Sequence, residues 1–462
     1  MVRRMVHRRA VLAGMVLLLL GIGREAASGQ AAWKAGAAKV SITPQRFMWM
    51  AGYGGRKEPA SGKHTDLWVK SLVLEDACGR RAAMVSLDLV GMDHQLATAI
   101  CGELRQRFGL ERRQVALCFS HTHSGPVVGR NLEPLHYRQV DAEQQSLIEQ
   151  YAAKLQEQVV ACVGEAIENI EPVGLRWGSG TAAFAVNRRN NREPDVPALR
   201  EQNALVGPND HDVPVLAVRT AAGRLKAVVF GYACHATVLG ELSWCGDYPG
   251  FAQAELESRH AECVALFWAG CGADQNPIPR RELRLAQEYG RQLADAVTEV
   301  LAGEMEPVAS SIATAYREVP LKLEAAPSVD ELEKAAESEN RYEQARARML
   351  LEGLAAGQPV PQAYPYGIGA WVLGGQIRWV FLGGEVVVDY SLRLKSEAGG
   401  KRTWVVGYAN DVMAYIPSRR VLEEGGYEGK TAMVYYGLPS AWTPEVEQTV
   451  IAAVHALVEE AR

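Results

Sequence analysis

The sequence predicts an α/β protein, with a mixed β-sheet core flanked by helices in one large domain. Short apolar runs bounded by turn residues, such as 82–90 and 115–119, alternate with longer amphipathic stretches such as 146–170 and 282–301. Such runs indicate buried strands, and strands that alternate with helices indicate an α/β architecture. Hydrophobic residues make up 48% of the 462-residue chain, which is ample for a large core. Because no Ser-, Gly- or Pro-rich linker follows, we expect one domain over 31–462.

Strands and helices are predicted from the spacing of apolar residues and from the turn residues that bound each run. The run 82–90 is nearly all apolar, which is typical of a strand buried on both faces. The polar stretch 328–354 is dominated by Glu, Lys, Arg and Ala, and we interpret it as a helical insertion on the surface or over a cleft. Strands are predicted at 38–44, 67–74, 82–90, 115–119, 215–218, 227–233, 264–268, 369–373, 377–382 and 404–408. Helices are predicted at 96–108, 146–170, 251–259, 282–301, 328–354 and 443–460.

Residues 1–30 have the pattern of a secretory signal peptide. Four arginines lie within the first nine residues, an apolar run covers 10–22, and small residues follow at 26–29. The pair Arg8-Arg9 before the apolar run is also typical of a twin-arginine signal. We therefore expect an exported protein that is periplasmic, extracellular or anchored in the membrane through an uncleaved signal. No other segment predicts a membrane span.

Composition excludes some functions. The formal net charge is −5 with acids and bases interspersed, so the clustered Lys and Arg of a nucleic-acid groove are absent from the sequence. None of the 8 cysteines forms a C-x-x-C pair, which argues against a zinc knuckle. Export permits disulfides, and the cysteines inside apolar runs fit buried free thiols equally well. Nothing in the sequence indicates the oligomeric state.

The most informative stretch is 115–126, where an apolar run ends in Ser-His-Thr-His-Ser-Gly-Pro. Side chains two apart on a strand share a face, so His121 and His123 are expected to project together from the end of the strand. Such a pair can begin a metal site or can be two hydrogen-bonded loop histidines. Asp88, at the end of another buried strand, either orients a ligand histidine or makes a structural hydrogen bond. The glycine-rich segment 50–56 lacks the strand and helix of a phosphate-binding loop.

Four other apolar runs also end in polar, glycine-rich sequence, at 230–237, 268–277, 380–385 and 406–415. Ligands in α/β sheets bind beyond the carboxyl ends of strands. Taken singly, each segment fits a structural role. Taken together, they would bring His235, Glu385 and Tyr415 to the same cleft as the first two histidines.

The order of these segments and their residues resemble the catalytic domain of the neutral/alkaline (non-lysosomal) ceramidases, from about Gly36 to near the C-terminus. The His-Thr-His-Ser-Gly-Pro motif is fairly specific to this family, and the shorter motifs support the resemblance because they occur in the same order. The matching pieces are 120–126, Asn187-Arg188, His235-Ala236-Thr237, Gly246-Asp247, Gly384-Glu385, Tyr415 and Tyr427-Glu428-Gly429.

The resemblance implies a zinc-dependent hydrolase that cleaves an N-acyl, ceramide-like amide with metal-activated water, and hence a place in sphingolipid metabolism. Two imidazoles, a carboxylate and a phenol suit Zn²⁺, and a bound metal favours the deprotonated phenol. The implied substrate is a small-molecule or lipid amide, with peripheral contact to a membrane. The resemblance assigns zinc to His121, His235, Glu385 and Tyr415, and assigns the substrate to His123, Arg188 and Asn187.

Two departures from the family pattern bear on activity. The family's Gly-Asp-x-Ser-Pro-Asn aligns with 272–277, where Gln275 replaces a serine proposed to be catalytic. Glutamine cannot be an acyl-accepting nucleophile, so Asp274 and Gln275, which occupy this catalytic position, would orient substrate or form a turn. We also expect no C-terminal immunoglobulin-like domain. The alternatives are therefore a zinc hydrolase of esters or of N-acyl or acetyl sugars, and a non-catalytic secreted binding protein on the same fold.

Overall fold

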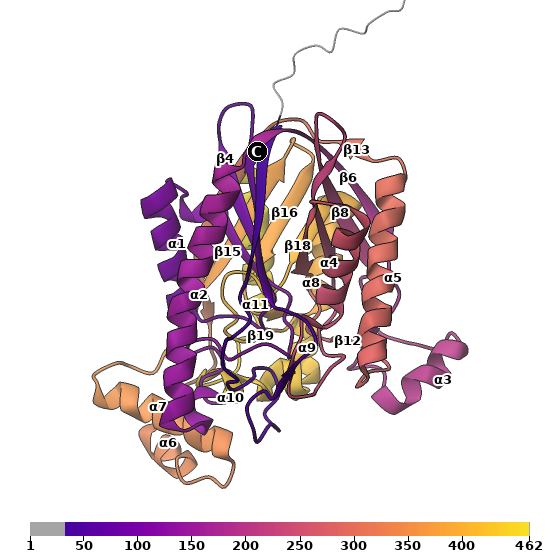
Figure 1. The fold of residues 1–462 in the computed structure, drawn as a ribbon. Coiled ribbons are helices and arrows are strands. Elements are labelled where there is room, and N and C mark those ends of the chain that lie inside the picture. The colour runs from indigo at the N-terminus through magenta and orange to yellow at the C-terminus, as the bar shows by residue number, and fades with distance from the viewer. Residues whose placement is uncertain (1–32, 462) are drawn as a thin grey trace, which may run out of the picture. The chain divides into compact units, whose positions relative to one another are not determined.

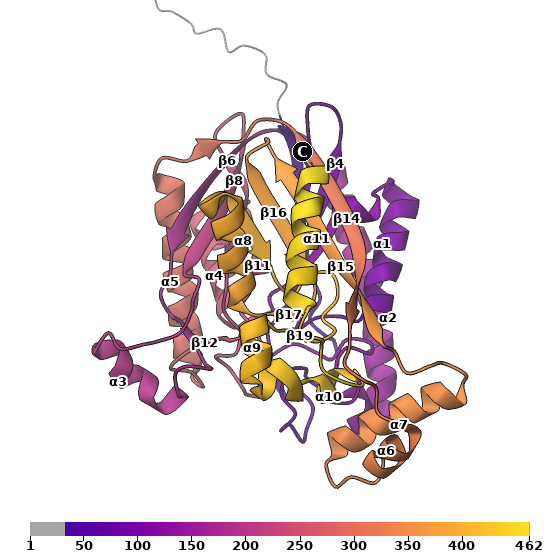
Figure 2. The same ribbon diagram turned by 180° about the vertical axis from the view of Figure 1, so that it is seen from behind.

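Two β-sheets packed face to face form the centre of the protein, and helices cover the outer face of each sheet (Figures 1 and 2). The computed structural model describes residues 33–461. These residues belong to a single unit over Ala31–Arg462. The expected signal peptide at 1–30 lies outside the described residues. Among the helices of 33–461, none is long and apolar enough to cross a membrane.

The larger sheet has nine strands in the order β11-β9-β8-β6-β1-β3-β4-β5, with β13 paired to β6. Two neighbouring pairs, β4–β5 and β9–β11, are parallel and the others are antiparallel, so the sheet is mixed as predicted. The strands are β1 (Trp33–Ser41), β3 (Trp68–Glu75), β4 (Arg81–Leu87), β5 (Val115–Phe119), β6 (Glu171–Thr181), β8 (Asp212–Thr220), β9 (Leu225–Tyr232), β11 (Val264–Ala269) and β13 (Glu306–Pro307).

The larger sheet curls strongly, and this brings its two ends together. Although β11 and β5 stand at opposite ends of the strand order, β11 contacts β3, β4 and β5. The Nζ of Lys70 on β3 donates to the carbonyl of Ala265 on β11 at 3.0 Å, and the Oγ of Ser86 on β4 donates to the carbonyl of Phe267 at 2.5 Å. These bonds satisfy edge carbonyls of β11 that no strand pairs. The loops that follow β5, β9 and β11 therefore meet.

The smaller sheet has the order β14-β15-β16-β18, and its strands are β14 (Ile312–Lys322), β15 (Ala363–Leu373), β16 (Ile377–Leu382) and β18 (Thr403–Val406). Tryptophans join the two sheets: Trp268 lies 6.3 Å from Trp379, and Trp177 lies 6.4 Å from Trp404, between ring centroids. Three short ladders complete the sheets: β2 (Gly62–Lys63) with β10 (Ser243–Trp244), β7 (Ala185–Asn187) with β12 (Gln275–Pro277), and β17 (Glu385–Val386) with β19 (Tyr415–Ile416).

Helices α1 (His94–Phe108), α2 (Ala142–Glu168), α4 (Asp247–Arg259) and α5 (Leu283–Ala302) bury their apolar sides on the larger sheet, whereas α8 (Val388–Ala398) and α11 (Val446–Glu460) pack on the smaller one. Helices α6 and α7 extend from the end of the molecule where β12 and β19 lie, and α3 extends from the other side of that end (Figures 1 and 2). The remaining short helices are α3 (Val196–Glu201), α6 (Val329–Ala335), α7 (Arg341–Ala355), α9 (Arg419–Glu424) and α10 (Met433–Tyr436).

The predicted α/β class, with a mixed sheet and flanking helices, is confirmed. The strands of the apolar run 369–382 belong to the smaller sheet, which packs on the larger one. The long strands β6 and β14 were not predicted, since exposed polar side chains interrupt their apolar pattern. All 8 cysteines are free thiols and seven are buried, which agrees with the alternative to disulfides.

Candidate metal centre and active site

His121 and His123 lie in the loop after β5. His121 has a left-handed backbone, with φ of 57°. The prediction that strand alternation would align the two histidines was therefore wrong, because β5 ends at Phe119 and a sharp loop turns them instead. They do meet: their Nε2 atoms are 3.2 Å apart. The Nδ1 of His121 lies 2.6 Å from the carbonyl oxygen of Val90, which fixes the ring so that Nε2 points inward.

His235 follows β9 and is held by the loop after β11. Its backbone N–H donates to the carbonyl of Gln275 at 3.0 Å, and its Nδ1 lies 2.8 Å from the carbonyl oxygen of Gly272. Its ring centroid is 4.9 Å from that of His121. Burial, reinforced by the charge of Arg188, lowers the pKa of His235 to about 4. The ring is therefore neutral at neutral pH, which is the state that binds a metal ion.

Glu385 and Tyr415 approach from the smaller sheet. They are partners in the parallel ladder of β17 and β19, so their side chains lie side by side. Gly384 has φ of +73°, and a Cβ there would lie 2.6 Å from the carbonyl oxygen of Ala414. Only glycine fits this turn without strain, and the turn places Glu385 against the histidines.

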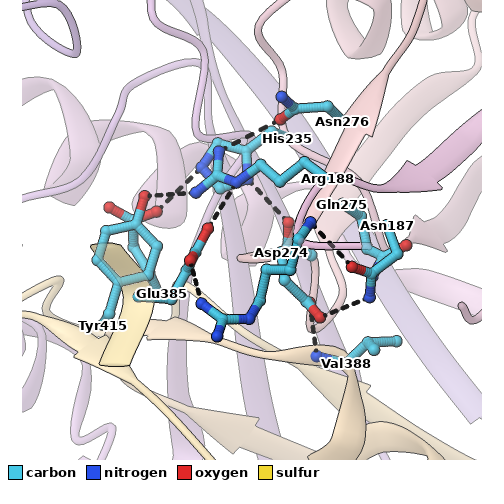
Figure 3. Close-up of polar contacts among 12 residues, drawn as sticks. Asn187, Arg188, His235, Asp274, Gln275, Asn276, Glu385, Val388 and Tyr415 are labelled. Carbon is cyan, nitrogen blue, oxygen red and sulfur yellow. Dashed lines mark hydrogen bonds and ion pairs between the residues drawn. The ribbon is translucent and has the colours of Figure 1, made fainter. Parts of the chain in front are cut away.

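The carboxylate of Glu385 joins the two halves of the site (Figure 3). Its Oε2 lies 3.3 Å from the Nε2 of His121 and 3.0 Å from the Nε2 of His235. The hydroxyl of Tyr436 on α10 donates to its other oxygen, Oε1. Burial alone would raise the pKa of Glu385, but His121 and His235 hold it well below its usual range. The group is therefore a carboxylate at neutral pH.

These atoms fit a zinc ion. The Nε2 of His235 and the Oε2 of Glu385 are buried and face each other at 3.0 Å, and neither makes a hydrogen bond to a group outside the histidine–glutamate cluster, although buried polar atoms are nearly always paired. A cation between them would satisfy both. Carbonyl oxygens hold the outer nitrogens of His121 and His235, which is the usual support for metal-binding imidazoles. Burial raises the pKa of Tyr415 well above its usual value, so Tyr415 is a neutral phenol until a cation lowers that pKa.

His123 also belongs geometrically to the cluster. Its ligand nitrogen and those of His121 and His235 all lie within 4.8 Å of one another. It differs from the other two in being half-buried rather than buried, so it is the one that reaches the surface. Its Nδ1 makes no hydrogen bond, and burial together with the two neighbouring imidazoles lowers its pKa well below the usual value.

Arg188, directly after β7, lies beside the phenol (Figure 3). Its Nη2 donates to the hydroxyl of Tyr415 at 3.2 Å, its Nη1 to the Oδ1 of Asn276 at 3.3 Å and its Nε to Glu428 at 2.8 Å. Its backbone N–H donates to the carbonyl of Asp274 at 2.9 Å. The guanidinium is thus oriented by three side chains and its position relative to Tyr415 is fixed.

Three residues next to the site make hydrogen bonds to other protein groups: Asn187, Asp274 and Gln275. Asp274 accepts the backbone N–H of Val388 at 3.0 Å and the Nδ2 of Asn187 at 2.9 Å. The Nε2 of Gln275 donates to the carbonyl of Pro208 at 3.2 Å, and its Oε1 is buried without a hydrogen bond. These bonds tie together the loops that carry Asn187, Asp274, Pro208 and Val388.

The loop 50–56 supports His123, and its role was not predicted. Gly52 lies against the imidazole with φ of +98°, and its N–H donates to the Nε2 of His136 at 3.0 Å. The ring of Tyr53 packs edge-on at 4.8 Å between centroids, and Arg56 donates to the carbonyl of His123 at 2.8 Å. The glycines of this loop could be noticed in the sequence, but the sequence did not show that Gly52 packs against His123. The same holds for Tyr436.

Comparison with known proteins gives consistent matches. The family model described as neutral/alkaline non-lysosomal ceramidase, N-terminal, matches residues 33–272. The neutral ceramidase of Pseudomonas aeruginosa is 25% identical over 262 residues, which are 54% of this chain and 38% of that protein. The neutral ceramidase of Drosophila melanogaster is 28% identical over 240 residues, 50% of this chain and 33% of that protein. The matched region therefore spans well under half the length of these relatives.

Solved structures show the same fold. A crystal structure of neutral ceramidase from Pseudomonas aeruginosa superposes with a TM-score of 0.69 at 19% identity, covering 92% of this chain and 75% of that chain. A structure described as ceramidase complexed with C2 gives a TM-score of 0.70, also at 19% identity, and covers 93% and 76% of the two chains. The likeness extends over both sheets, beyond the part that the family model matches.

Proposed function

Because the chain belongs to the neutral/alkaline non-lysosomal ceramidase family, we propose that it is a zinc-dependent hydrolase of a lipid N-acyl amide. One observation supports the zinc: a buried carboxylate oxygen of Glu385 faces the Nε2 atoms of His121 and His235, and neither this oxygen nor the nitrogen of His235 has a hydrogen bond outside the cluster. The ceramidase names of the relatives support the amide.

In the proposed site His121, His235, Glu385 and Tyr415 hold the metal. Bound zinc would polarise the substrate carbonyl and lower the pKa of a water molecule, which makes hydrolysis feasible near neutral pH. The hydroxyl of the half-buried Tyr436 fixes Glu385 by its hydrogen bond to Oε1. Arg188 holds the phenol of Tyr415 and presents the rest of its guanidinium to a polar group of the substrate.

His123 is the proton carrier in this proposal. It is half-buried beside the ligand cluster, and its low pKa keeps the ring neutral, so one nitrogen can donate a proton while the other accepts one. It would pass a proton to the leaving amine nitrogen. Gln275 has no hydroxyl, so water rather than the side chain at this position would attack the carbonyl.

Export and membrane contact belong to the same proposal. The charged and apolar pattern of residues 1–30 supports secretion. A lipid amide in a bilayer would require the protein to contact the membrane surface at the end that carries the site. Fractionation followed by N-terminal sequencing tests export, and an intact Met1 on a cytoplasmic protein would contradict it.

Metal analysis and hydrolysis together test the enzyme. Purified wild type is expected to hold a single zinc ion and to cleave a short-chain N-acylsphingosine, and a chelator is expected to abolish cleavage. His235→Ala should lose both zinc and activity. His455→Ala, a change on the surface of α11, should lose neither. Equal zinc in His235→Ala and wild type would remove this residue from the centre, and zinc-loaded protein that cleaves no amide would contradict the proposed reaction.

A further inference from the structure

A cleft of about 540 Å³ opens beside the metal centre. Arg188 forms part of its wall and donates to the hydroxyl of Tyr415. Tyr427, also in the wall, packs edge-on against Tyr415 with ring centroids 5.3 Å apart. The cleft therefore lies next to the proposed zinc ligand Tyr415, within reach of one end of a substrate bound at the proposed zinc site.

The charges on the wall are paired with one another. Arg188 and Arg189 both bind Glu428, at 2.8 and 2.6 Å. Arg189 also binds Glu424 at 2.9 Å, and Arg280 binds Glu193 at 2.5 Å. Three arginines thus face three glutamates, and the wall carries no net charge. A phosphate or carboxylate would meet a glutamate beside each of these arginines, so the cleft favours an uncharged or zwitterionic group.

The wall also offers little to an acyl chain. Its one aliphatic side chain, Ile278, is buried against Val186 and Val196 and is only 1% exposed. What the wall offers instead are hydrogen-bond donors and an aromatic face. The Oδ1 of Asn276 accepts from Arg188, which leaves its NH₂ group for a ligand. The Nη1 of Arg280 is likewise unused by Glu193, since Nε and Nη2 make those bonds.

Tyr427 supplies the aromatic face. It is 44% exposed, one of the few large hydrophobic side chains of residues 33–461 that reach solvent. Its ring lies 5.9 Å from the guanidinium of Arg188. A flat ring beside polar donors matches a sugar ring, which has an apolar face of C–H groups and an edge of hydroxyls.

We propose that this cleft is a subsite for an uncharged polyhydroxylated group, such as a hexose ring, carried on the N-acyl substrate. The proposal rests on the proposed hydrolase function for the placement of the amide, but not for the recognition of the sugar. Tyr427 would stack on the sugar face, and Asn276 and Arg280 would donate to its hydroxyls. A glycosylated lipid amide or an N-acyl amino sugar would then be cleaved in preference to a lipid amide with a bare head group.

The test uses methyl β-D-glucopyranoside, a probe that contains a hexose and no amide. Binding to the purified full chain is measured by saturation-transfer NMR and titration. Wild type is expected to bind at millimolar concentrations, as single sugar rings do on shallow sites. Tyr427→Ala should weaken binding at least tenfold, whereas Tyr427→Phe keeps the ring and should stay within twofold. Arg280→Ala, on a different part of the wall, should weaken binding at least threefold.

Phe47→Ala is the matched control, because Phe47 is 53% exposed and lies outside the cleft; its binding should equal that of wild type. No binding to folded wild type, or equal binding by Tyr427→Ala and wild type, would overturn the subsite. The amide assay separates the two proposals. Cleavage of N-acylsphingosine without glucoside binding would remove the subsite and keep the hydrolase. Glucoside binding without cleavage of any amide would keep the subsite and remove the hydrolase.

Discussion

Gly52→Ala is the sharpest test of how His123 is positioned. The native φ of +98° is one that side-chain-bearing residues rarely adopt, and left-handed backbone costs about 1–2 kcal/mol without glycine. The new methyl carbon would also lie 2.4 Å from the Cγ of His123, so the imidazole must move by roughly 1 Å to reach van der Waals contact. A shift of about 1 Å at a catalytic group costs on the order of 10²-fold in rate.

The assay compares Gly52→Ala with Gly79→Ala. Gly79 has φ of +77° and nothing lies within 4 Å of a Cβ built there, so it carries similar strain with no contact to the site. Both variants should melt somewhat below wild type. Only Gly52→Ala should lose about two orders of magnitude in kcat/KM for amide hydrolysis, and its zinc content should be unchanged because His123 is not a proposed ligand. Equal kcat/KM in the two variants would refute the reasoning.

Three further substitutions probe the centre and its surroundings. Tyr436→Phe removes the hydrogen bond to Glu385 and should weaken zinc binding about 10- to 100-fold in a chelator competition; unchanged affinity would show that this bond does not support the ligand. Arg188→Lys keeps the charge but cannot contact Tyr415, Asn276 and Glu428 together, so kcat/KM should fall at least tenfold with zinc retained, and wild-type turnover would contradict this. Burial raises the pKa of Asp88 to about 6, so the native state binds a proton that the unfolded chain has lost between about pH 4 and pH 6, and the free energy of unfolding should fall by about 3 kcal/mol across that window. Urea unfolding of Asp88→Asn should show a flatter pH profile, and an unchanged slope would assign the effect to other groups.

The sequence predicted which segments form the site, but it did not predict the curl of the larger sheet that brings them together. The segments after β5, β9, β16 and β18 each carry one proposed zinc ligand, and apolar runs that end in glycine-rich polar sequence mark all four. Nothing local could show that the larger sheet curls until β11 contacts β3 and β4. That contact depends on Lys70 and Ser86, which satisfy carbonyls of β11 about 180 to 195 residues away in sequence.

The residues that hold the proposed zinc ligands in place were also not predicted, because they are far from the ligands in the sequence. Val90 and Gly272 hold the histidines through carbonyl oxygens, which every residue possesses, so no residue type marks them. Asp88 was one candidate for orienting a ligand. The structure instead has it accept from Trp68 and Gln253, the structural alternative. Tyr436 contacts Glu385 and Gly52 contacts His123, each far away in the chain. Only Gly52 was noticeable in the sequence, as part of a glycine-rich segment.

The replacement of the family's serine by Gln275 can be separated from the metal centre on physical grounds. His235 is held by the carbonyl oxygens of Gly272 and Gln275, at 2.8 and 3.0 Å, and neither bond involves a side chain of this loop. The side chain of Gln275 instead reaches the carbonyl of Pro208. A change of residue type here therefore leaves the backbone bonds that hold His235 in place. The proposed metal centre and the proposed sugar subsite are therefore independent of the residue type at position 275.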